Sequence, residues 1–210
     1  MRFTGFPEAA LLFYEGLEAD NSKTYWTEHR QTYDECARAP MQAMLTELEP
    51  EFGAATIYRP YRDVRFSKDK TPYKTAVAAS AGGFYVQLSA DGLMVAAGYY
   101  DTASDQVDRL RRAVDDDVQG PSLERIVAAL RRAGCDIGGQ RLKTRPRGYD
   151  ADHPRIELLK HRTLIAHRHW APASWLHTAR AKQRVRKAWR EFADLDRWLD
   201  SNVGHSNQRR

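Results

Sequence analysis

The pattern of apolar and polar positions is most regular between residues 84 and 99. Apolar side chains occupy every second position at both ends of this stretch, as in Phe84-Tyr85-Val86-Gln87-Leu88. The Ala90-Asp91-Gly92 segment between the two alternating runs has the composition of a tight turn. Because a period of two is typical of strands, this stretch predicts an antiparallel hairpin, with residues 74–80 as a third strand.

Helical spacing of apolar residues replaces this alternation on both sides of the hairpin. Pro40 and the Gly120-Pro121-Ser122 segment are each expected to end one helix and open the next. The first expected helix is short and begins near Pro7. Further helices are expected at about residues 21–38, 40–52, 105–118, 123–133 and 156–159, and one or two helices at about 174–203. The resulting fold class is α+β, with a small antiparallel sheet around the hairpin at about 84–99, packed by N-terminal and C-terminal helices.

Shorter strands are expected at residues 57–58, 64–66, 140–143 and 163–169. The sequence contains neither an internal repeat nor a linker that would divide it, so residues 1–204 are expected to form a single α+β domain. Residues 205–210 are expected to form a flexible tail.

The composition is sufficient for one hydrophobic core, because 42% of the 210 residues are hydrophobic. Charge is distributed unevenly along the chain. Residues 1–56 carry 4 basic and 10 acidic side chains, a net charge of −6, and residues 119–210 carry 20 basic and 9 acidic side chains, a net charge of +11. The basic C-terminal region has two interpretations, a solvated surface or a surface that attracts an acidic partner.

Several classes of protein are excluded by what the sequence lacks. No apolar run approaches the roughly 18 residues of a membrane span, and the N-terminus lacks the apolar core of a signal peptide, so a cytoplasmic protein with no membrane partner is expected. Cys36 and Cys135 are too few for a disulfide framework. Neither a GxGxxG nor a phosphate-loop motif occurs, and His161, His167 and His169 lack the spacing of a metal site, so neither cofactor nor metal is expected.

Residues 58–74 form the stretch that is richest in candidate chemistry. They combine six Arg or Lys residues with two Asp residues and four aromatic residues. Arginine binds phosphate and carboxylate groups through two parallel hydrogen bonds, and lysine supplies a point charge to the same anions. Aromatic side chains offer stacking surfaces for a base or ring. The stretch therefore predicts an anion-binding site.

A second mixed surface is expected on the helix at residues 21–38. Trp26, His29, Arg30 and Tyr33 lie at relative positions i, i+3, i+4 and i+7, so they share one face. A face that mixes aromatic and cationic side chains suits either the wall of a site or a partly buried, hydrogen-bonded helix. Both interpretations remain open at this point.

Three stretches resemble the widespread family of uncharacterised bacterial and fungal proteins known as domain of unknown function 2461. They are Phe3-Thr4-Gly5-Phe6-Pro7 with Ala10-Leu11, the set Asn21, Lys23, Trp26, His29, Arg30 and Tyr33, and the set Arg59, Arg62-Asp63, Arg65-Phe66, Asp69-Lys70 and Tyr73-Lys74. The likeness covers about residues 2–200 and includes the hairpin. It implies a single α+β domain and no particular activity.

We expect these residues to bind a small anionic ligand that carries phosphate or carboxylate, with nucleic acid as a weaker candidate partner. The predicted ligand-binding residues are Trp26, Arg30, Tyr33, Arg59, Arg62, Arg65, Lys68, Lys70, Tyr73 and Lys74. Three alternatives remain. The protein could be a phosphoester- or nucleotide-processing enzyme with His29 or Asp63 as acid or base, a nucleic-acid-binding module, or a purely structural hub in which Asp63 and Asp69 pair with Arg and Lys to pin helix to sheet. The oligomeric state is left open.

Overall fold

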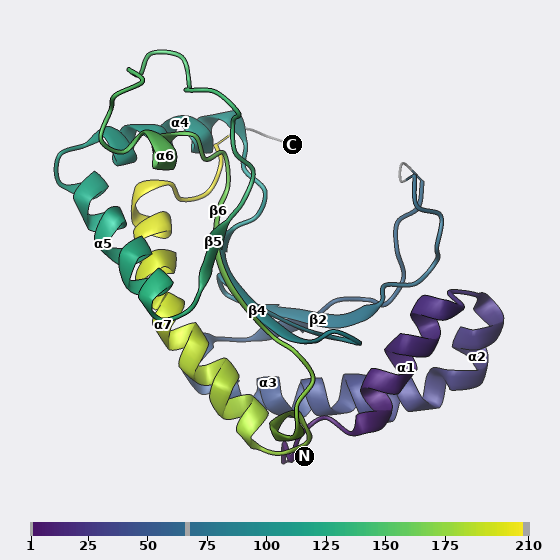
Figure 1. Cartoon of the computed structure of the whole chain (residues 1–210). Helices are drawn as coiled ribbons and strands as arrows, with labels where there is room; N and C mark the ends of the chain where they lie inside the picture. Colours follow the sequence, from purple (N-terminus) through teal and green to yellow (C-terminus); the bar gives the residue numbers. More distant parts are fainter. Residues whose placement is uncertain (1, 66–67, 208–210) are drawn as a thin grey trace. The chain divides into compact units, whose positions relative to one another are not determined.

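The computed structural model describes residues 2–65 and 68–207 (Figure 1). Its strands form a sheet in the order β1-β2-β3-β4-β6-β5. The strands are β1 (Ala55–Ile57), β2 (Ala76–Ala81), β3 (Phe84–Ser89), β4 (Gly92–Tyr99), β5 (Asp136–Gly138) and β6 (Leu164–Trp170). The α-helices are α1 (Glu8–Ala19), α2 (Lys23–Thr32), α3 (Ala39–Phe52), α4 (Ser104–Asp115), α5 (Gln119–Arg132), α6 (Ile156–Leu159) and α7 (Arg180–Asn202). The α+β prediction is confirmed.

The chain divides into two compact units. Unit 1 comprises Met1–Val95 and His169–Ala188, and unit 2 comprises Ala96–Arg168 and Trp189–Arg210. The elements β4, β6 and α7 are divided between them. That residues 1–204 form a single domain stays a prediction. None of the helices in the described part of the chain has the length and apolar character that crossing a membrane would require.

The predicted hairpin is confirmed as β3 and β4, which are neighbours in the sheet, and β3 belongs to unit 1. In β3, Phe84, Val86 and Leu88 are buried while Tyr85 and Gln87 are partly exposed. Strand β2 pairs with β3 in the antiparallel register Ala78↔Gln87 and Ser80↔Tyr85. One face of these strands is therefore apolar and contributes to the core, and the other carries polar and small side chains.

The helical region after α2 differs from the prediction. The helical path is not interrupted at Pro40, because the π-helical segment η1 (Tyr33–Arg38) leads directly from α2 into α3. The backbone N–H of Ala39 donates to the carbonyl of Asp34, five residues earlier, as the wider π-helical turn requires. Proline has no N–H to contribute at the next position. Pro40 therefore fits the first turn of α3 without interrupting the helix.

Two predictions in unit 2 were wrong in position. Helix α5 begins at Gln119 and includes Gly120 and Pro121, because the carboxylate of Asp116 accepts hydrogen bonds from Val118 N and Gln119 N, both at 2.8 Å. The strand expected at 140–143 is instead β5, which pairs with β6 in the register Ile137↔Ala166. Only an isolated bridge at Arg141 falls in the predicted range.

Inside unit 1, acidic side chains of the N-terminal region form ion pairs with basic side chains of the C-terminal region. Glu47 of α3 forms an ion pair with Lys182 of α7, and Glu51 pairs with Arg186 at 3.2 Å. Glu47 also accepts a hydrogen bond from Phe3 N at 2.7 Å. The Lys182 ammonium and the Phe3 N–H hold the pKa of Glu47 below its usual range. Part of the positive charge near the C-terminus thus stabilises helix packing.

Residues 205–207, expected as part of a flexible tail, make hydrogen bonds with α4. Ser206 Oγ and Asn207 N both donate to the carboxylate of Asp105, at 2.7 and 2.9 Å, and Arg109 donates to His205 O at 2.7 Å. Residues 208–210 lie outside the described residues. The hydrogen bonds from Ser206 and Asn207, helped by the Arg109 guanidinium, lower the pKa of Asp105 from 3.8 to about 2.

This lowered pKa predicts an acid-dependent loss of stability. A carboxylate with a depressed folded-state pKa contributes stability above its unfolded-state pKa and loses it as the pH falls through the folded-state value. The contribution of Asp105 should therefore be complete above pH 3.8 and should disappear toward about pH 2. Urea denaturation across this window should show a flatter pH dependence for Asp105→Asn than for the wild type. Asp108→Asn, an exposed change on the same helix, should retain the wild-type profile.

Candidate functional site

The charged stretch forms a two-stranded extension of the sheet, which we call the arm (residues 58–75). Tyr58 N donates to Ala78 O at 2.9 Å, so the β1–β2 pairing continues into the arm. Farther out, Tyr61 and Tyr73 form an antiparallel bridge, with Arg62 N donating to Pro72 O at 2.9 Å. The strand expected at 64–66 is not formed by Val64 and Arg65, and Phe66 lies outside the described residues. Figure 1 shows the arm as a loop that extends from the β2 end of the sheet.

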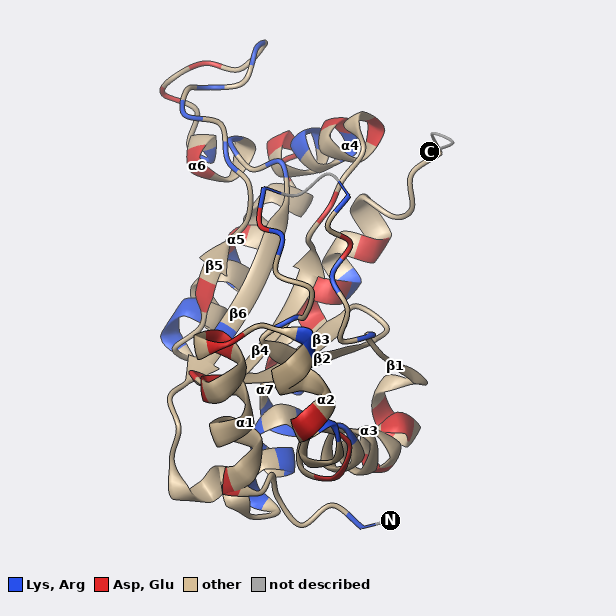
Figure 2. Cartoon of the chain, turned by 90° about the vertical axis from the view of Figure 1, so that its right-hand side faces the viewer, with Lys and Arg blue, Asp and Glu red and all other residues tan. Residues whose placement is uncertain are grey.

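The two aspartates of the arm pair with basic residues of the arm itself. Asp63 accepts from Arg65 Nε at 2.9 Å and from Nη2 at 2.6 Å. Asp69 accepts from Thr71 N at 2.9 Å and also pairs with Arg62. Figure 2 shows basic and acidic residues intermixed along this part of the chain. These pairs therefore order the arm locally, which differs from the helix-to-sheet pairing considered for a structural hub.

These interactions also affect the chemistry of Asp63. The side chain and backbone N–H of Arg65 hold the pKa of Asp63 below its usual range. A carboxylate with a lowered pKa is a weak proton acceptor. The assignment of Asp63 as an acid or base stays an untested prediction.

Helix α2 is joined to the arm by the amide side chain of Asn21. Tyr73 N donates to Asn21 Oδ1 at 3.0 Å, and Asn21 Nδ2 donates to Tyr73 O at 3.1 Å. Ser22, and not Asn21, is the N-cap residue of α2, because its Oγ accepts from Tyr25 N at 3.1 Å. In the arm ribbon, the N–H and C=O of Tyr73 point away from the Tyr61 strand. Asn21 therefore satisfies both backbone groups on this outer edge.

Replacing Asn21 should loosen the arm more than the helix. Asn21→Ala leaves the N–H and C=O of Tyr73 without these partners, at a cost of about 1–3 kcal/mol in the free energy of unfolding. Asn21→Asp keeps the acceptor but loses the donor, so its effect should be intermediate. Hydrogen exchange at the Tyr73 amide should accelerate in Asn21→Ala. The control Ser22→Ala should cost about 1 kcal/mol through the lost N-cap and leave that amide protected.

An aromatic cluster reinforces the same junction. The rings of Trp26 and Tyr73 are stacked, with centroids 4.4 Å apart and planes inclined by 9°. Tyr33 and Tyr61 also contact Trp26, at centroid distances of 4.9 and 6.0 Å. Trp26, Tyr33 and Tyr73 are all at least 95% buried. Three predicted ligand-binding residues are thus packed against one another where α2 and η1 meet the arm.

The two basic residues predicted on the same helix face take other partners. The ring of His29 stacks on Tyr25 at 4.0 Å, and its Nδ1 donates to Tyr25 O at 2.9 Å. Arg30 faces Asp34 at 3.6 Å and is largely exposed. The helix therefore reaches the arm through aromatic residues, while His29 is held against its own helix.

A pocket of about 380 Å³ opens on the polar face of β2 and β3, at the base of the arm. We call it the arm pocket, and its lining residues are Tyr58, Arg62, Lys74, Thr75, Ala76, Ala78, Tyr85 and Gln87. Lys74, Ala76 and Ala78 lie on the same face because side chains alternate along a strand. Small residues thus form the floor, cations lie at one end, and Tyr85 and Gln87 lie at the other.

Lys74 is the most unusual charge in this pocket. Its ammonium lies over the ring of Tyr58, 5.5 Å from the centroid. Partial burial, together with the neighbouring charges of Arg59 and Arg62, lowers the pKa of Lys74. Among residues 2–65 and 68–207, no carboxylate forms an ion pair with it. An anion in the pocket would therefore relieve repulsion among the three cations.

The arm pocket contains two of the predicted ligand-binding residues, Arg62 and Lys74. Arg59, Arg65, Lys68 and Lys70 are exposed, and Lys70 Nζ donates to Val64 O at 2.9 Å. The prediction omitted Tyr85 and Gln87, which come from β3. The alternation in β3 already placed both on the face opposite the core, and this pattern could have identified them.

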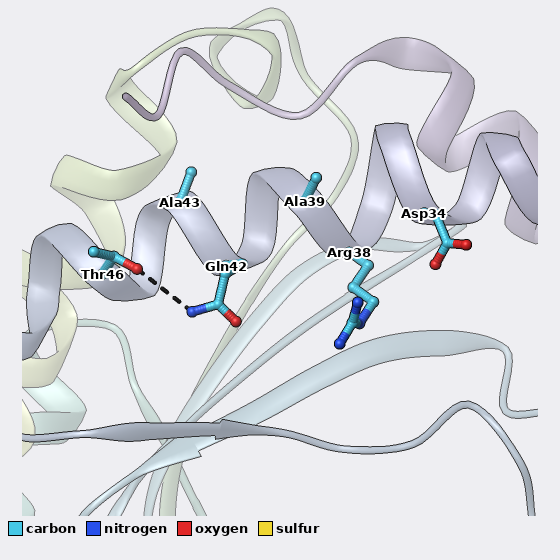
Figure 3. A pocket seen from close by; sticks show the side chains of 6 residues that line it. All are labelled: Asp34, Arg38, Ala39, Gln42, Ala43 and Thr46. Atoms are coloured by element: carbon cyan, nitrogen blue, oxygen red, sulfur yellow. Dashed lines mark hydrogen bonds between the residues drawn. The ribbon is translucent and has the colours of Figure 1, made fainter. Parts of the chain in front are cut away.

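A second pocket, of about 270 Å³, lies along η1 and α3. Its lining residues are Asp34, Arg38, Ala39, Gln42, Ala43 and Thr46. Figure 3 shows that all six come from one continuous helical ribbon and that the two alanines point away from Arg38 and Gln42. Because its polar groups do not converge from several elements, this pocket is less suited to a specific ligand.

His161 and His167, two of the histidines considered for a metal site, interact with different partners. His161 is buried, with Nδ1 donating to Thr163 O at 3.0 Å, and burial lowers its pKa. His167 faces Asp136 at 3.9 Å. Within the described ranges 2–65 and 68–207, no three His, Cys, Asp or Glu side chains are grouped as a metal site would need.

Comparison with known proteins gives one match. A family model described as a conserved hypothetical protein (DUF2461) matches residues 9–198 of the 210-residue chain. Neither the curated proteins nor the solved structures contain a significant match.

Proposed function

The chain belongs to the DUF2461 family of conserved hypothetical proteins, and we propose that this member binds a small anion, phosphate or carboxylate, in the arm pocket. The observation that supports the proposal best is the environment of Lys74. This cation is partly buried, lies beside Arg59 and Arg62, and has no carboxylate partner among the residues that the structure describes. A bound anion would complete its charge balance.

The hydrogen-bond donors of the pocket support the same conclusion. Arg62 shares its guanidinium with Asp69 but still lines the pocket. Tyr85 Oη donates to Gln87 Oε1 at 2.7 Å, which leaves the amide nitrogen of Gln87 for a ligand. The pocket therefore offers mainly donors, and donors stabilise an anion.

The cellular setting that we infer is the cytoplasm. Cys36 and Cys135 are both free thiols, which suits a reducing compartment.

Nucleic acid is a less favoured partner than a small anion, because Asp63 and Asp69 already pair with Arg65 and Arg62 along the arm. A long polyanion would have to compete with both aspartates.

Titration with inorganic phosphate, followed by calorimetry or ³¹P NMR, tests the proposal. Lys74→Gln removes the charge but retains a similar length, and should weaken binding about tenfold or more. The matched control is Lys68→Gln, because Lys68 is exposed and lies outside the pocket. It should bind phosphate as the wild type does. Equal affinities for the wild type and Lys74→Gln, or an equal loss in both variants, would contradict the arm pocket as the site.

A further inference from the structure

We propose that the ligand of the arm pocket is a nucleoside monophosphate, with a flat ring at the Tyr85 and Gln87 end and one phosphate at the Lys74 and Arg62 end. The inference rests on the proposed anion binding and adds a ring to the ligand. Four features of the pocket support it: the alanines of its floor, the rings of Tyr58 and Tyr85, the amide nitrogen of Gln87, and a positive charge that suits one phosphate.

The floor consists of small side chains, because β2 contributes Ala76 and Ala78 to the pocket lining. Ala76 and Ala78 follow Lys74 at every second position on the polar face. The neighbouring strands place Tyr58 on one side of Ala78 and Gln87 on the other. A planar ring can therefore lie on the alanines between polar and aromatic neighbours.

Two tyrosines give the ring a stacking or edge contact. The ring centroids of Tyr58 and Tyr85 are 6.4 Å apart, with planes inclined by 33°. The Tyr58 hydroxyl donates to Ser80 Oγ at 2.9 Å, so this ring is fixed across the strand. Because the Lys74 ammonium lies 5.5 Å from the Tyr58 centroid, the cationic and aromatic ends are within the span of one small molecule.

The amide of Gln87 can distinguish a nucleobase from a simple apolar ring. Its oxygen accepts from the Tyr85 hydroxyl, which directs its nitrogen donors to other acceptors. Ring nitrogens and carbonyl oxygens at the edge of a base are such acceptors.

The charge of the pocket matches a single phosphate. Asp69 pairs with Arg62, and Asp63 pairs with Arg65, so Lys74 supplies the main uncompensated charge inside the pocket. The volume of about 380 Å³ falls in the range of small-molecule sites and would be mostly unfilled by phosphate alone. A ring-bearing monophosphate satisfies both conditions.

Calorimetry with inorganic phosphate, adenosine and adenosine 5′-monophosphate tests the inference. Adenosine 5′-monophosphate should bind about tenfold more tightly than phosphate, through base–aromatic stacking. Tyr85→Leu should remove this advantage without changing phosphate affinity, while Lys74→Gln should weaken both. Ala78→Leu fills the floor and should block the nucleotide selectively. Circular dichroism establishes that each variant is folded, and either Tyr85→Leu or Ala78→Leu suffices for the test.

The two proposals fail in different ways. Phosphate binding that depends on Lys74, with adenosine 5′-monophosphate no tighter, would overturn the nucleotide inference and leave anion binding in place. If the wild-type protein bound no phosphate in the arm pocket, the proposed function itself would be overturned. Tighter binding of a decathymidylate, weakening steeply with salt, would also overturn the monophosphate assignment in favour of nucleic acid.

Discussion

Trp26→Ala should lower the free energy of unfolding by about 3–5 kcal/mol, the range for removing a large aromatic side chain from a core. Trp26 is 4% exposed and contacts Phe13, Tyr33 and Tyr73, at ring-centroid distances of 5.9, 4.9 and 4.4 Å. The substitution would leave a cavity between α1, α2 and the arm. Urea denaturation measures the loss, and hydrogen exchange at the Tyr73 amide reports whether the arm is released.

Two further variants sharpen this prediction. The indole Nε1 of Trp26 is buried and has no hydrogen-bond partner among the described residues. Trp26→Phe removes this unpaired group and keeps an aromatic ring, so it should cost less than half as much as Trp26→Ala. Trp175→Ala, at a partly exposed tryptophan that contacts Arg184, should also cost less. A Trp26→Ala protein as stable as Trp175→Ala would contradict the role of the aromatic cluster.

Gly98→Ala should destabilise unit 2 by about 3 kcal/mol. The new side chain would strain the backbone at a positive φ, and its Cβ would collide with the backbone of Leu164. Gly98 has φ +123°, and a Cβ at this position would lie 2.2 Å from the carbonyl oxygen of Leu164. Both atoms involved in the collision would be attached to paired strands of the sheet, which have little freedom to separate. Thermal or urea denaturation measures the change.

The control separates strain from collision. Gly134 also has a positive φ, +78°, but a Cβ there would meet nothing within 4 Å. Gly134→Ala should therefore cost only the strain, about 1 kcal/mol. If the two alanine variants were equally stable, close approach of the strand at Leu164 would not be the reason for glycine at position 98.

The sequence predicted the hairpin well because alternation is a local property. The side-chain pattern of Phe84–Ser89 is dictated by burial of one sheet face and is visible without knowing which element covers it. The same alternation indicates that Tyr85 and Gln87 lie on the face opposite the core. Elements that depend on local sequence rules, including most helices, could therefore be predicted.

The hydrogen bonds that join α2 to the arm could not be predicted in the same way. Asn21 and Tyr73 are 52 positions apart, and nothing near either residue identifies the other. Pairing of Asp63 with an Arg or Lys was one of the alternatives that the sequence left open, and the sequence could not decide between this pairing and an anion-binding role for Arg65. Charge composition alone does not decide whether cations face a ligand or a neighbouring carboxylate.

The wide turn at Tyr33–Arg38 holds one residue more than a regular α-helix would place between α2 and α3. A π-helical turn accommodates this extra residue without adding the rotation of about 100° that one more residue gives an α-helix. Trp26 and Tyr33 on one side of the turn, and Met41, Met44, Leu45 and Leu48 beyond it, can therefore all be buried. Deleting one residue from the turn would convert it to regular α-helix and leave the buried face of α3 in place. Deleting one residue from the α-helical part of α3 would instead rotate every later side chain of that helix by about 100°.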